Sequence, residues 1–273
     1  MLPLAPILSG VVFVLLVLHQ GPVRSVLYAA IALALLAAVS MIGKTPLIQI
    51  AANALGTWLP VLALAALLRH WRSIALTLQV SVIVGALAIL AIFVVVGDPT
   101  VFWTEVLREI APVFAQLGFQ EQADVLLTRA DQIAPQMTLL VVFTSWSMYV
   151  AVLLLGYSLL QTLPDESSRF GRFCDLNLGR VLAIAMATAS VAALLSNAAW
   201  LQNVAFFMFA VFFLQGLATL HWFFAEGRVP GVVLAVVYVS FLIFNVVLVV
   251  GLAVAGYLDA WFDYRKRATG RST

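Results

Sequence analysis

Seven stretches of this sequence contain no Asp, Glu, Lys or Arg, and each is long enough to cross a lipid bilayer as a helix. About 20 apolar residues in a helix span ~30 Å of hydrocarbon. The stretches are residues 1–23, 25–43, 45–68, 73–97, 132–164, 181–225 and 229–258. The sixth is far longer than one span needs, and a polar segment at 197–203 divides it in two. The sequence therefore predicts eight spans.

Helices are the form that these spans take, because every backbone N–H and C=O in hydrocarbon needs a partner within its own segment. None of the spans shows the alternating pattern of a barrel strand. The composition agrees, since 64% of the residues are hydrophobic and 10% are charged, against about 25% charged in soluble domains. We expect an all-α polytopic transmembrane bundle that forms a single domain over residues 1–258 and contacts membrane lipids. A basic juxtamembrane tail at 259–273 follows it.

Two connections between the spans carry most of the remaining charge. Residues 98–135 contain six acids and two arginines, a net charge of −4. Their apolar residues recur at helical spacing, and Asp98 and Pro99 suit the start of a helix. We expect amphipathic surface helices over 99–133 and an interfacial elbow at 164–180, where arginines, acids and aromatic residues alternate.

In the eight-span arrangement, the lysines and arginines outside the spans do not decide the membrane orientation. Lysines and arginines number seven on each face, so the positive-inside rule gives no preference. The cluster at 265–267 lies directly beside the last span and favours a cytoplasmic C-terminus in a bacterial inner (plasma) membrane. The net charge of +2 is scattered and lacks the basic stripe that nucleic-acid binding requires.

The tail begins with GYLDAWFDYRKR at 256–267. As one continuous helix, it would place its aromatic residues on one face and its acids on the opposite, exposed side. This pattern is typical of a helix leaving the bilayer, with aromatics at headgroup depth and cations beyond. Two other uses remain open, a carboxylate pair acting on lipid and docking of the basic tail onto the acidic 98–135 segment. The tail residues concerned are Asp259, Trp261, Asp263, Arg265, Lys266 and Arg267.

The G-x-x-D-x-W-x-D-x-R pattern beginning at Gly256, together with FFLQGLATLHWF at 212–223, resembles the YybS-like family of bacterial membrane proteins. That family is distantly similar to the substrate-capturing S-components of energy-coupling-factor transporters. The resemblance implies a helical bundle with a small-molecule cavity. S-components dock through alanines four apart in the first helix, and the nearest match here is Ala30, Ala34 and Ala38 in the second span.

Neutral polar side chains line up within several spans. An unpaired amide in hydrocarbon costs several kcal/mol, so these side chains must face protein or water. They either fasten helices together or line a cavity suited to an uncharged or zwitterionic ligand. The candidate ligand-binding residues are Gln49, Asn53, Thr57, Ser145, Tyr149, Gln215, Tyr238 and Asn245.

The leading functional hypothesis is therefore S-component-like binding and transport of a small uncharged or zwitterionic molecule. The alternative is a non-transporting accessory or assembly protein that holds a protein partner through the 98–135 segment. We expect no enzyme, no catalytic residues, no metal and no cofactor. The chain contains no nucleophile, phosphate-loop or zinc motif, it has a single cysteine, and its three histidines are far apart in sequence.

Overall fold

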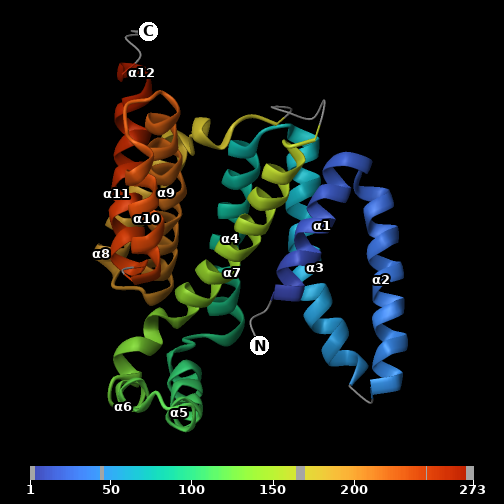
Figure 1. Ribbon diagram of the computed structural model, residues 1–273. Helices are drawn as coiled ribbons and strands as arrows, with labels where there is room; N and C mark the ends of the chain where they lie inside the picture. Colours follow the sequence, from blue (N-terminus) through green and yellow to red (C-terminus); the bar gives the residue numbers. More distant parts are fainter. Residues whose placement is uncertain (1–3, 44–45, 164–169, 244, 269–273) are drawn as a thin grey trace. The chain divides into compact units, whose positions relative to one another are not determined.

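The computed structural model describes residues 4–43, 46–163, 170–243 and 245–268, and all of their regular elements are helices (Figure 1). The all-α prediction is confirmed. The helices are α1 (Leu4–Gln20), α2 (Pro22–Gly43), α3 (Leu47–Trp71), α4 (Ile74–Val96), α5 (Thr100–Gln116), α6 (Gln120–Thr128), α7 (Ala130–Leu160), η1 (Phe173–Asp175), α8 (Gly179–Ser196), α9 (Ala199–Ala225), α10 (Gly231–Ile243), α11 (Asn245–Phe262) and α12 (Tyr264–Ala268).

Six of the described helices, α2, α3, α4, α7, α8 and α9, are long and apolar enough to cross a membrane. Three more apolar helices, α1, α10 and α11, are shorter. These are the helices of an integral membrane protein, but the count of eight spans is not confirmed. The stretch 229–258, expected to hold one span, is divided between the helices α10 and α11, the second of which continues to Phe262; they lie side by side in Figure 1.

The chain divides into two compact units, and α4 and α7 each contribute to both. The N-terminal unit comprises Met1–Ser81 and Ser145–Leu176, and the C-terminal unit comprises Val82–Thr144 and Asn177–Thr273.

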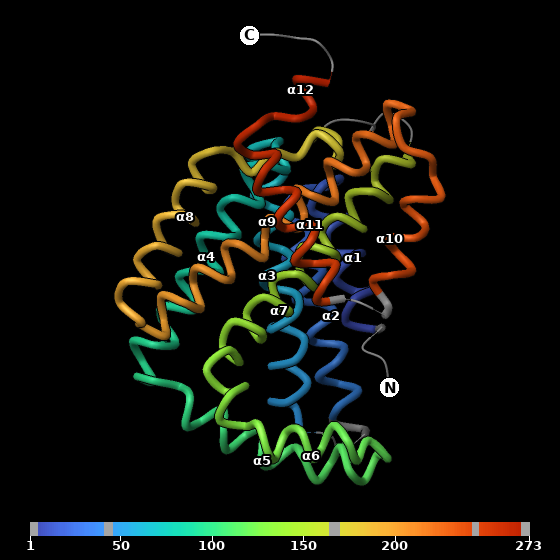
Figure 2. The backbone as a smooth tube through the Cα atoms, turned by 90° about the vertical axis from the view of Figure 1, so that its left-hand side faces the viewer, coloured from blue at the N-terminus to red at the C-terminus, as the bar shows by residue number. Residues whose placement is uncertain are grey.

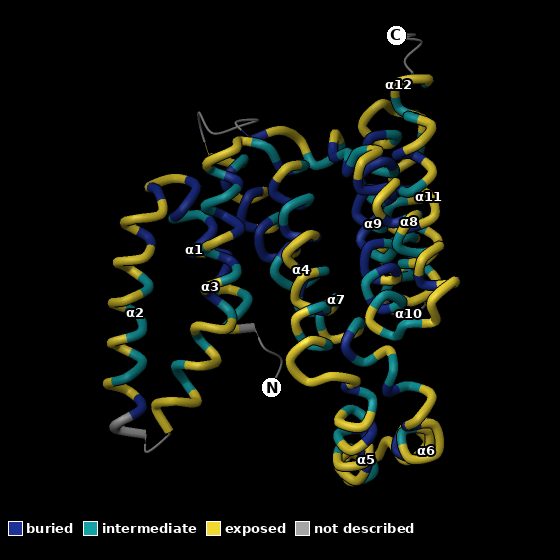
Figure 3. Tube along the Cα trace, turned by 180° about the vertical axis from the view of Figure 1, so that it is seen from behind, coloured by how far each residue is buried: buried dark blue, intermediate teal, exposed yellow. Residues whose placement is uncertain are grey.

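In the N-terminal unit, α1 is the buried centre and α2 is an outer helix, seen in Figure 3 mainly in the colours of exposed and intermediate residues. Glycine allows α7 to approach α1 closely, because a Cβ on Gly156 would lie 2.6 Å from the Cβ of Val14. Arg69 of α3 donates to the carbonyl oxygens of Val17 and Leu18 at the end of α1. It thereby satisfies carbonyls that a helix end leaves without intrahelical partners.

In the C-terminal unit, the central contact is between α9 and α11. A Cβ on Gly216 would lie 2.0 Å from the carbonyl oxygen of Leu252, and one on Gly256 would lie 2.1 Å from that of Phe212. No side chain larger than hydrogen fits at either position. The two helices therefore pack backbone against backbone, as small residues allow between membrane helices.

The acidic connection forms two antiparallel helices, α5 and α6, which run side by side (Figure 2). Asp98 accepts hydrogen bonds from the backbone N–H of Thr100 at 3.0 Å and from its hydroxyl at 2.6 Å. These bonds lower the pKa of Asp98 from its usual 3.8. We expected the apolar face of α5 to lie on the bilayer, but part of this face packs against α7. Leu107 lies in a core with residues of α7, and the indole of Trp103 donates to the hydroxyl of Thr138 at 2.8 Å.

The elbow residues that the structure describes are packed against protein. Phe170 and Leu176 are each 2% exposed, and the Tyr157 hydroxyl donates to the carbonyl of Gly171 at 2.6 Å. Arg172 and Asp175 form a bidentate pair at 2.8 and 3.0 Å. Residues 164–169 of the predicted elbow lie outside the described residues.

Candidate functional site

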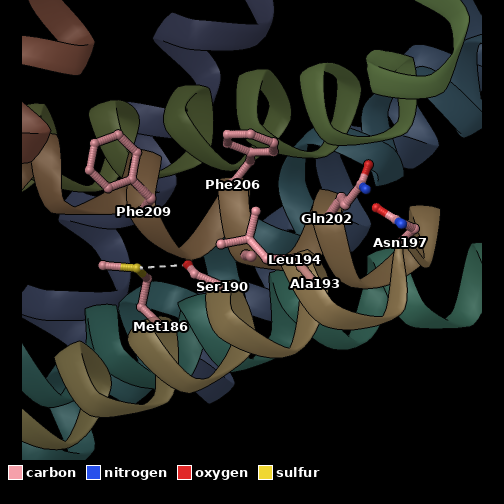
Figure 4. Close-up of a pocket in the computed structure, with 9 residues that line it drawn as sticks. Met186, Ser190, Ala193, Leu194, Asn197, Gln202, Phe206 and Phe209 are labelled. Carbon is pink, nitrogen blue, oxygen red and sulfur yellow. Dashed lines mark hydrogen bonds between the residues drawn. The ribbon is translucent and has the colours of Figure 1, made fainter.

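A cavity of about 550 Å³ lies between α8 and α9 in the C-terminal unit (Figure 4). The two helices are joined by a tight turn, in which Asn197 adopts a left-handed conformation with φ 52° and donates its N–H to the carbonyl of Ala193. Asparagine tolerates this conformation better than most residues. The turn brings the end of α8 and the start of α9 together at one end of the cavity.

The cavity exists because small residues face each other across the two helices. Ser190 and Ala193 on α8 and Ala205 on α9 leave the space, and larger side chains form the walls. The wall residues are Met186, Leu194, Phe206 and Phe209. The hydroxyl of Ser190 points along its own helix, 3.4 Å from the sulfur of Met186.

The two amides of the cavity lie at one of its ends. The amides of Asn197 and Gln202 lie close together there, while Phe206 and Phe209 line the length that leads away from them (Figure 4). The lining contains no charged residue. Such a site suits an uncharged molecule with a polar head and an apolar body, and its volume is within the ~300–1,000 Å³ usual for small-molecule sites.

A second polar feature of the C-terminal unit is a buried seam between α9 and α11. Gln215 is fully buried, accepts the backbone N–H of Leu178 at 2.8 Å and donates to Oδ2 of Asp259 at 2.9 Å. Arg265 donates to the same oxygen at 2.8 Å. The side chains of Arg265 and Asp259 are 11% and 0% exposed, so this is a buried ion pair. Oδ1 of Asp259 has no hydrogen-bond partner among the described residues.

The seam differs from the expectation for the tail. Asp259 does not lie on an exposed face, because the helix that carries it is pressed against α9. The helix also does not continue through the stretch, since Asp263 adopts φ 47° and separates α11 from α12. Asp263 therefore pairs with Arg180 and Lys266, each at 3.5 Å.

A third polar contact links α9 to α7. Asn203 is 4% exposed, donates to the carbonyl of Pro135 at 2.9 Å and accepts the N–H of Leu139 at 2.9 Å. These two backbone groups are four residues apart, so they would bond each other in an uninterrupted helix. The amide of Asn203 therefore adds a partner to both groups, in the turn of α7 that follows Pro135.

The eight predicted ligand-binding residues do not gather in this cavity. Gln49, Asn53, Thr57, Ser145 and Tyr149 belong to the N-terminal unit, and Gln215, Tyr238 and Asn245 belong to the C-terminal unit. None of them is among the residues that line the cavity.

The contacts of the eight predicted ligand-binding residues lie within one helix or join two neighbouring helices. Gln49 and Asn53 are exposed, and Thr57 donates to the carbonyl of Asn53 at 3.0 Å. Tyr149 donates to the carbonyl of Gly56 at 2.9 Å, and Ser145 is half-buried.

In the C-terminal unit, the hydroxyl of Tyr238 lies 3.1 Å from Nε2 of His221, whereas Gln215 lies in the buried seam between α9 and α11. The side chain of Asn245 lies outside the described residues. Within the described part of the chain, no three His, Cys, Asp or Glu side chains are close enough to hold a metal ion.

Sequence reasoning missed the cavity because its lining is defined by small residues on two helices. The 197–203 segment could have indicated the cavity, because residues at helical spacing before and after it line the space. In the sequence analysis, this segment only separates two spans. Comparisons with protein-family models, with curated proteins and with solved structures find no match to this chain.

Proposed function

We propose that this integral membrane protein binds a small uncharged amphiphilic molecule between α8 and α9 and helps to move it across or out of the bilayer. The observation that carries the proposal is the cavity of about 550 Å³ with amides at one end and apolar walls beyond. Asn197 lies in the turn between two helices of membrane-spanning length and Gln202 lies in the first turn of α9, so both amides lie toward a bilayer surface. A molecule with its head at Asn197 and Gln202 would extend its apolar body along α8 and α9 into the hydrocarbon.

Photocrosslinking tests this proposal directly. The protein is reconstituted in phosphatidylcholine nanodiscs with a photoactivatable long-chain alcohol, and the labelled peptides are identified by mass spectrometry. Labelling should concentrate in residues 186–209 and fall when Ser190→Phe fills the cavity. Thr188→Phe is the matched control, because Thr188 is exposed on the same helix and does not line the cavity. Equal labelling of parent and Ser190→Phe protein at these peptides would reject the site.

The resemblance to the YybS-like family and to S-components supports the transport part of the proposal. Ala30, Ala34 and Ala38 share one face of α2 and are exposed, as a surface for docking onto an energising module requires. Replacing Ala34 by Trp should abolish transport and leave photolabelling of the α8–α9 cavity intact. Loss of both would show that the substitution acts on folding.

An accessory function is the second candidate, and the exposed apolar side chains of α5 and α6 favour it. Phe102, Val113, Leu117 and Phe119 are each more than half exposed beside acidic residues. Such a surface suits a protein partner with apolar and basic side chains. A stoichiometric partner that co-purifies with the parent chain and is lost on deletion of residues 100–128 would favour this function.

We also propose that the protein lies in the bacterial inner membrane with its C-terminus in the cytoplasm. At about 1.5 Å per residue, α10 and α11 are about 20 and 27 Å long. Whether this pair enters the bilayer partway or crosses it twice, it returns the tail to the face of Arg228. The hydrogen bond from Arg228 to the carbonyl of Ala268 and the contact of Arg180 with Asp263 support this arrangement.

The return of α11 changes the charge balance between the two faces. Arg265, Lys266, Arg267 and Arg271 are then counted on the same membrane face as Arg228. The lysines and arginines on the two faces change from seven and seven to eleven and three. The positive-inside rule then favours the cytoplasm for that face. In right-side-out spheroplasts of a Cys174→Ser protein, an impermeant maleimide should label Glu121→Cys directly and Lys266→Cys only after permeabilisation. The reverse pattern would overturn the orientation.

A further inference from the structure

The first half of α3, in the N-terminal unit, contains no buried residue. The buried residues of α3 begin at Trp58, and every residue within 47–57 is exposed or half-buried. Figure 3 shows this half of the helix in the colours of exposed and intermediate residues. At 1.5 Å per residue it is about 16 Å long. It belongs to a helix of membrane-spanning length, so its uncovered face meets either lipid or a protein partner.

The length of α1 explains why this half of α3 is uncovered. The indole of Trp58 donates to the hydroxyl of Ser9, and Arg69 donates to the carbonyl of Leu18. These contacts join residues that are 49 and 51 positions apart, so α1 and α3 run parallel in one register. Because α1 begins five positions before Ser9, its start is level with about residues 53–55 of α3. The first two turns of α3 therefore extend beyond α1.

Two amide side chains project from the uncovered half of α3. Gln49 and Asn53 are exposed and lie about one turn apart, and neither amide has a hydrogen-bond partner among the residues that the structure describes. Arg69 binds the end of α1 and marks one end of the span. The roughly 20 residues before it cross the hydrocarbon, and they include both amides. Because hydrocarbon offers neither donor nor acceptor, these amides require a polar partner.

Small residues on the same face allow another helix to approach the two amides closely. Ala52 and Gly56 are exposed and four positions apart, and at 100° per residue both lie within about 60° of Gln49 around the helix. A Cβ on Gly56 would meet no atom within 4 Å, so no contact within the described chain requires a glycine there. Glycine is nevertheless a poor helix former. Small residues at this spacing, beside polar side chains, are typical of the contact face between paired membrane helices.

We propose that the first half of α3 pairs with α3 of a second copy of this chain, so that the protein forms a twofold-symmetric dimer in the membrane. Two copies inserted in the same direction have parallel α3 helices, and a twofold axis between them places Asn53 and Gln49 opposite the same residues of the second copy. An amide carries both donors and an acceptor, so two identical amides satisfy each other. This self-complementarity favours a second copy over a different protein.

Disulfide crosslinking in membranes tests the interface on a full-length Cys174→Ser protein. After oxidation, Ala52→Cys or Gly56→Cys should give a covalent species of twice the chain mass, because a disulfide needs Cβ atoms about 4 Å apart. Leu55→Cys is the matched control, since Leu55 is exposed at the same depth but lies about 100° from Gly56 around the helix, and it should give no such species. An adduct with a different protein, or no adduct at either position, would overturn the assignment to a second copy.

Counting subunits by single-molecule photobleaching in liposomes, at increasing lipid dilution, measures the strength of the pairing. Gln49→Leu with Asn53→Leu should raise the dissociation constant of the dimer about fiftyfold, because four interhelical hydrogen bonds contribute about 2.7-fold each.

A substitution at Gly56 separates the interface from the fold. Gly56→Ile adds a side chain where the described chain leaves open space, so it should abolish the dimer and leave the helical content in circular dichroism unchanged. Gly251→Ile, at an equally open glycine of α11, is the matched control and should dimerise as the parent does. A parent protein that is monomeric at every lipid dilution, or a Gly56→Ile protein that dimerises as the parent does, would refute the interface.

Discussion

The contact between α9 and α11 can be tested by adding a single methyl group. A Cβ on Gly256 would lie 2.1 Å from the carbonyl oxygen of Phe212 and 2.5 Å from the backbone nitrogen of Gly216. Nonbonded heavy atoms need about 3.5 Å, so the two helices would have to separate by more than about 1 Å. Because both obstacles are backbone atoms, no rotamer change can relieve the clash.

The free energy of this change follows from three terms. Overpacking costs about 1–3 kcal/mol. A separation of about 1 Å would also lengthen the 2.9 Å bond between Gln215 and Asp259 beyond hydrogen-bonding distance, which costs about 1–3 kcal/mol for buried groups. Alanine returns about 1 kcal/mol, because glycine is a poor helix former. We expect Gly256→Ala to lower the free energy of unfolding by about 3 kcal/mol, the middle of the range of about 1–5 kcal/mol that these terms give.

Gly251→Ala is the matched control for this prediction. Gly251 is exposed on the same helix, and a Cβ there would meet no atom within 4 Å. The control should be neutral or more stable by up to about 1 kcal/mol. Thermal unfolding in phosphatidylcholine nanodiscs, followed by tryptophan fluorescence, should show Gly256→Ala melting about 5–15 °C below the parent. If Gly256→Ala melts at or above the parent temperature, the described approach of α9 and α11 is wrong.

Three further predictions concern buried or capping groups. Arg265→Met should destabilise the protein by about 3–5 kcal/mol, because it leaves the Asp259 carboxylate buried without its cation; adding Asp259→Leu should restore most of this loss in the same melting assay. Asn203→Leu should cost about 2–3 kcal/mol by removing the two hydrogen bonds that the buried amide makes to the backbone of α7, and limited proteolysis should then cut near residue 135. The bonds to Thr100 lower the pKa of Asp98, so the ionised carboxylate stabilises the start of α5 above pH 3.8, and this stabilisation is lost as the pH falls through the lower folded pKa. Asp98→Asn should therefore remove the pH dependence of proteolysis in residues 98–116 without altering proteolysis elsewhere.

Spans and helical content could be predicted because hydrocarbon imposes length and apolarity on each segment separately. The charge-free stretches contain α1 to α4 and α7 to α9 nearly as drawn from the sequence. The stretch 229–258 was misread because its composition satisfies a single span as well as two shorter helices. The close approach of α11 to α9 decides between them, and it depends on Gly216 and Gly256, which are far apart in sequence.

Candidate sites were harder to predict because a polar residue in a span gives no indication of its partner. The sequence correctly required that Gln215 face protein, since hydrocarbon cannot solvate an amide. Its partner, Asp259, was instead expected on an exposed face, because helical periodicity describes one helix and carries no information about a neighbour. The cavity between α8 and α9 is likewise a property of two surfaces.

The sequence by itself determined that this protein is a helical membrane protein, because each segment of the chain must meet the requirements of the bilayer locally. Only the tertiary structure decided that Asp259 and Arg265 form a buried pair, that the amide of Asn203 binds the backbone of α7, and that Arg228 contacts Ala268 in the tail. These features depend on which helices meet and at what height. That choice is made by packing between surfaces distant in sequence, where one glycine in place of a larger residue sets the distance between two helices.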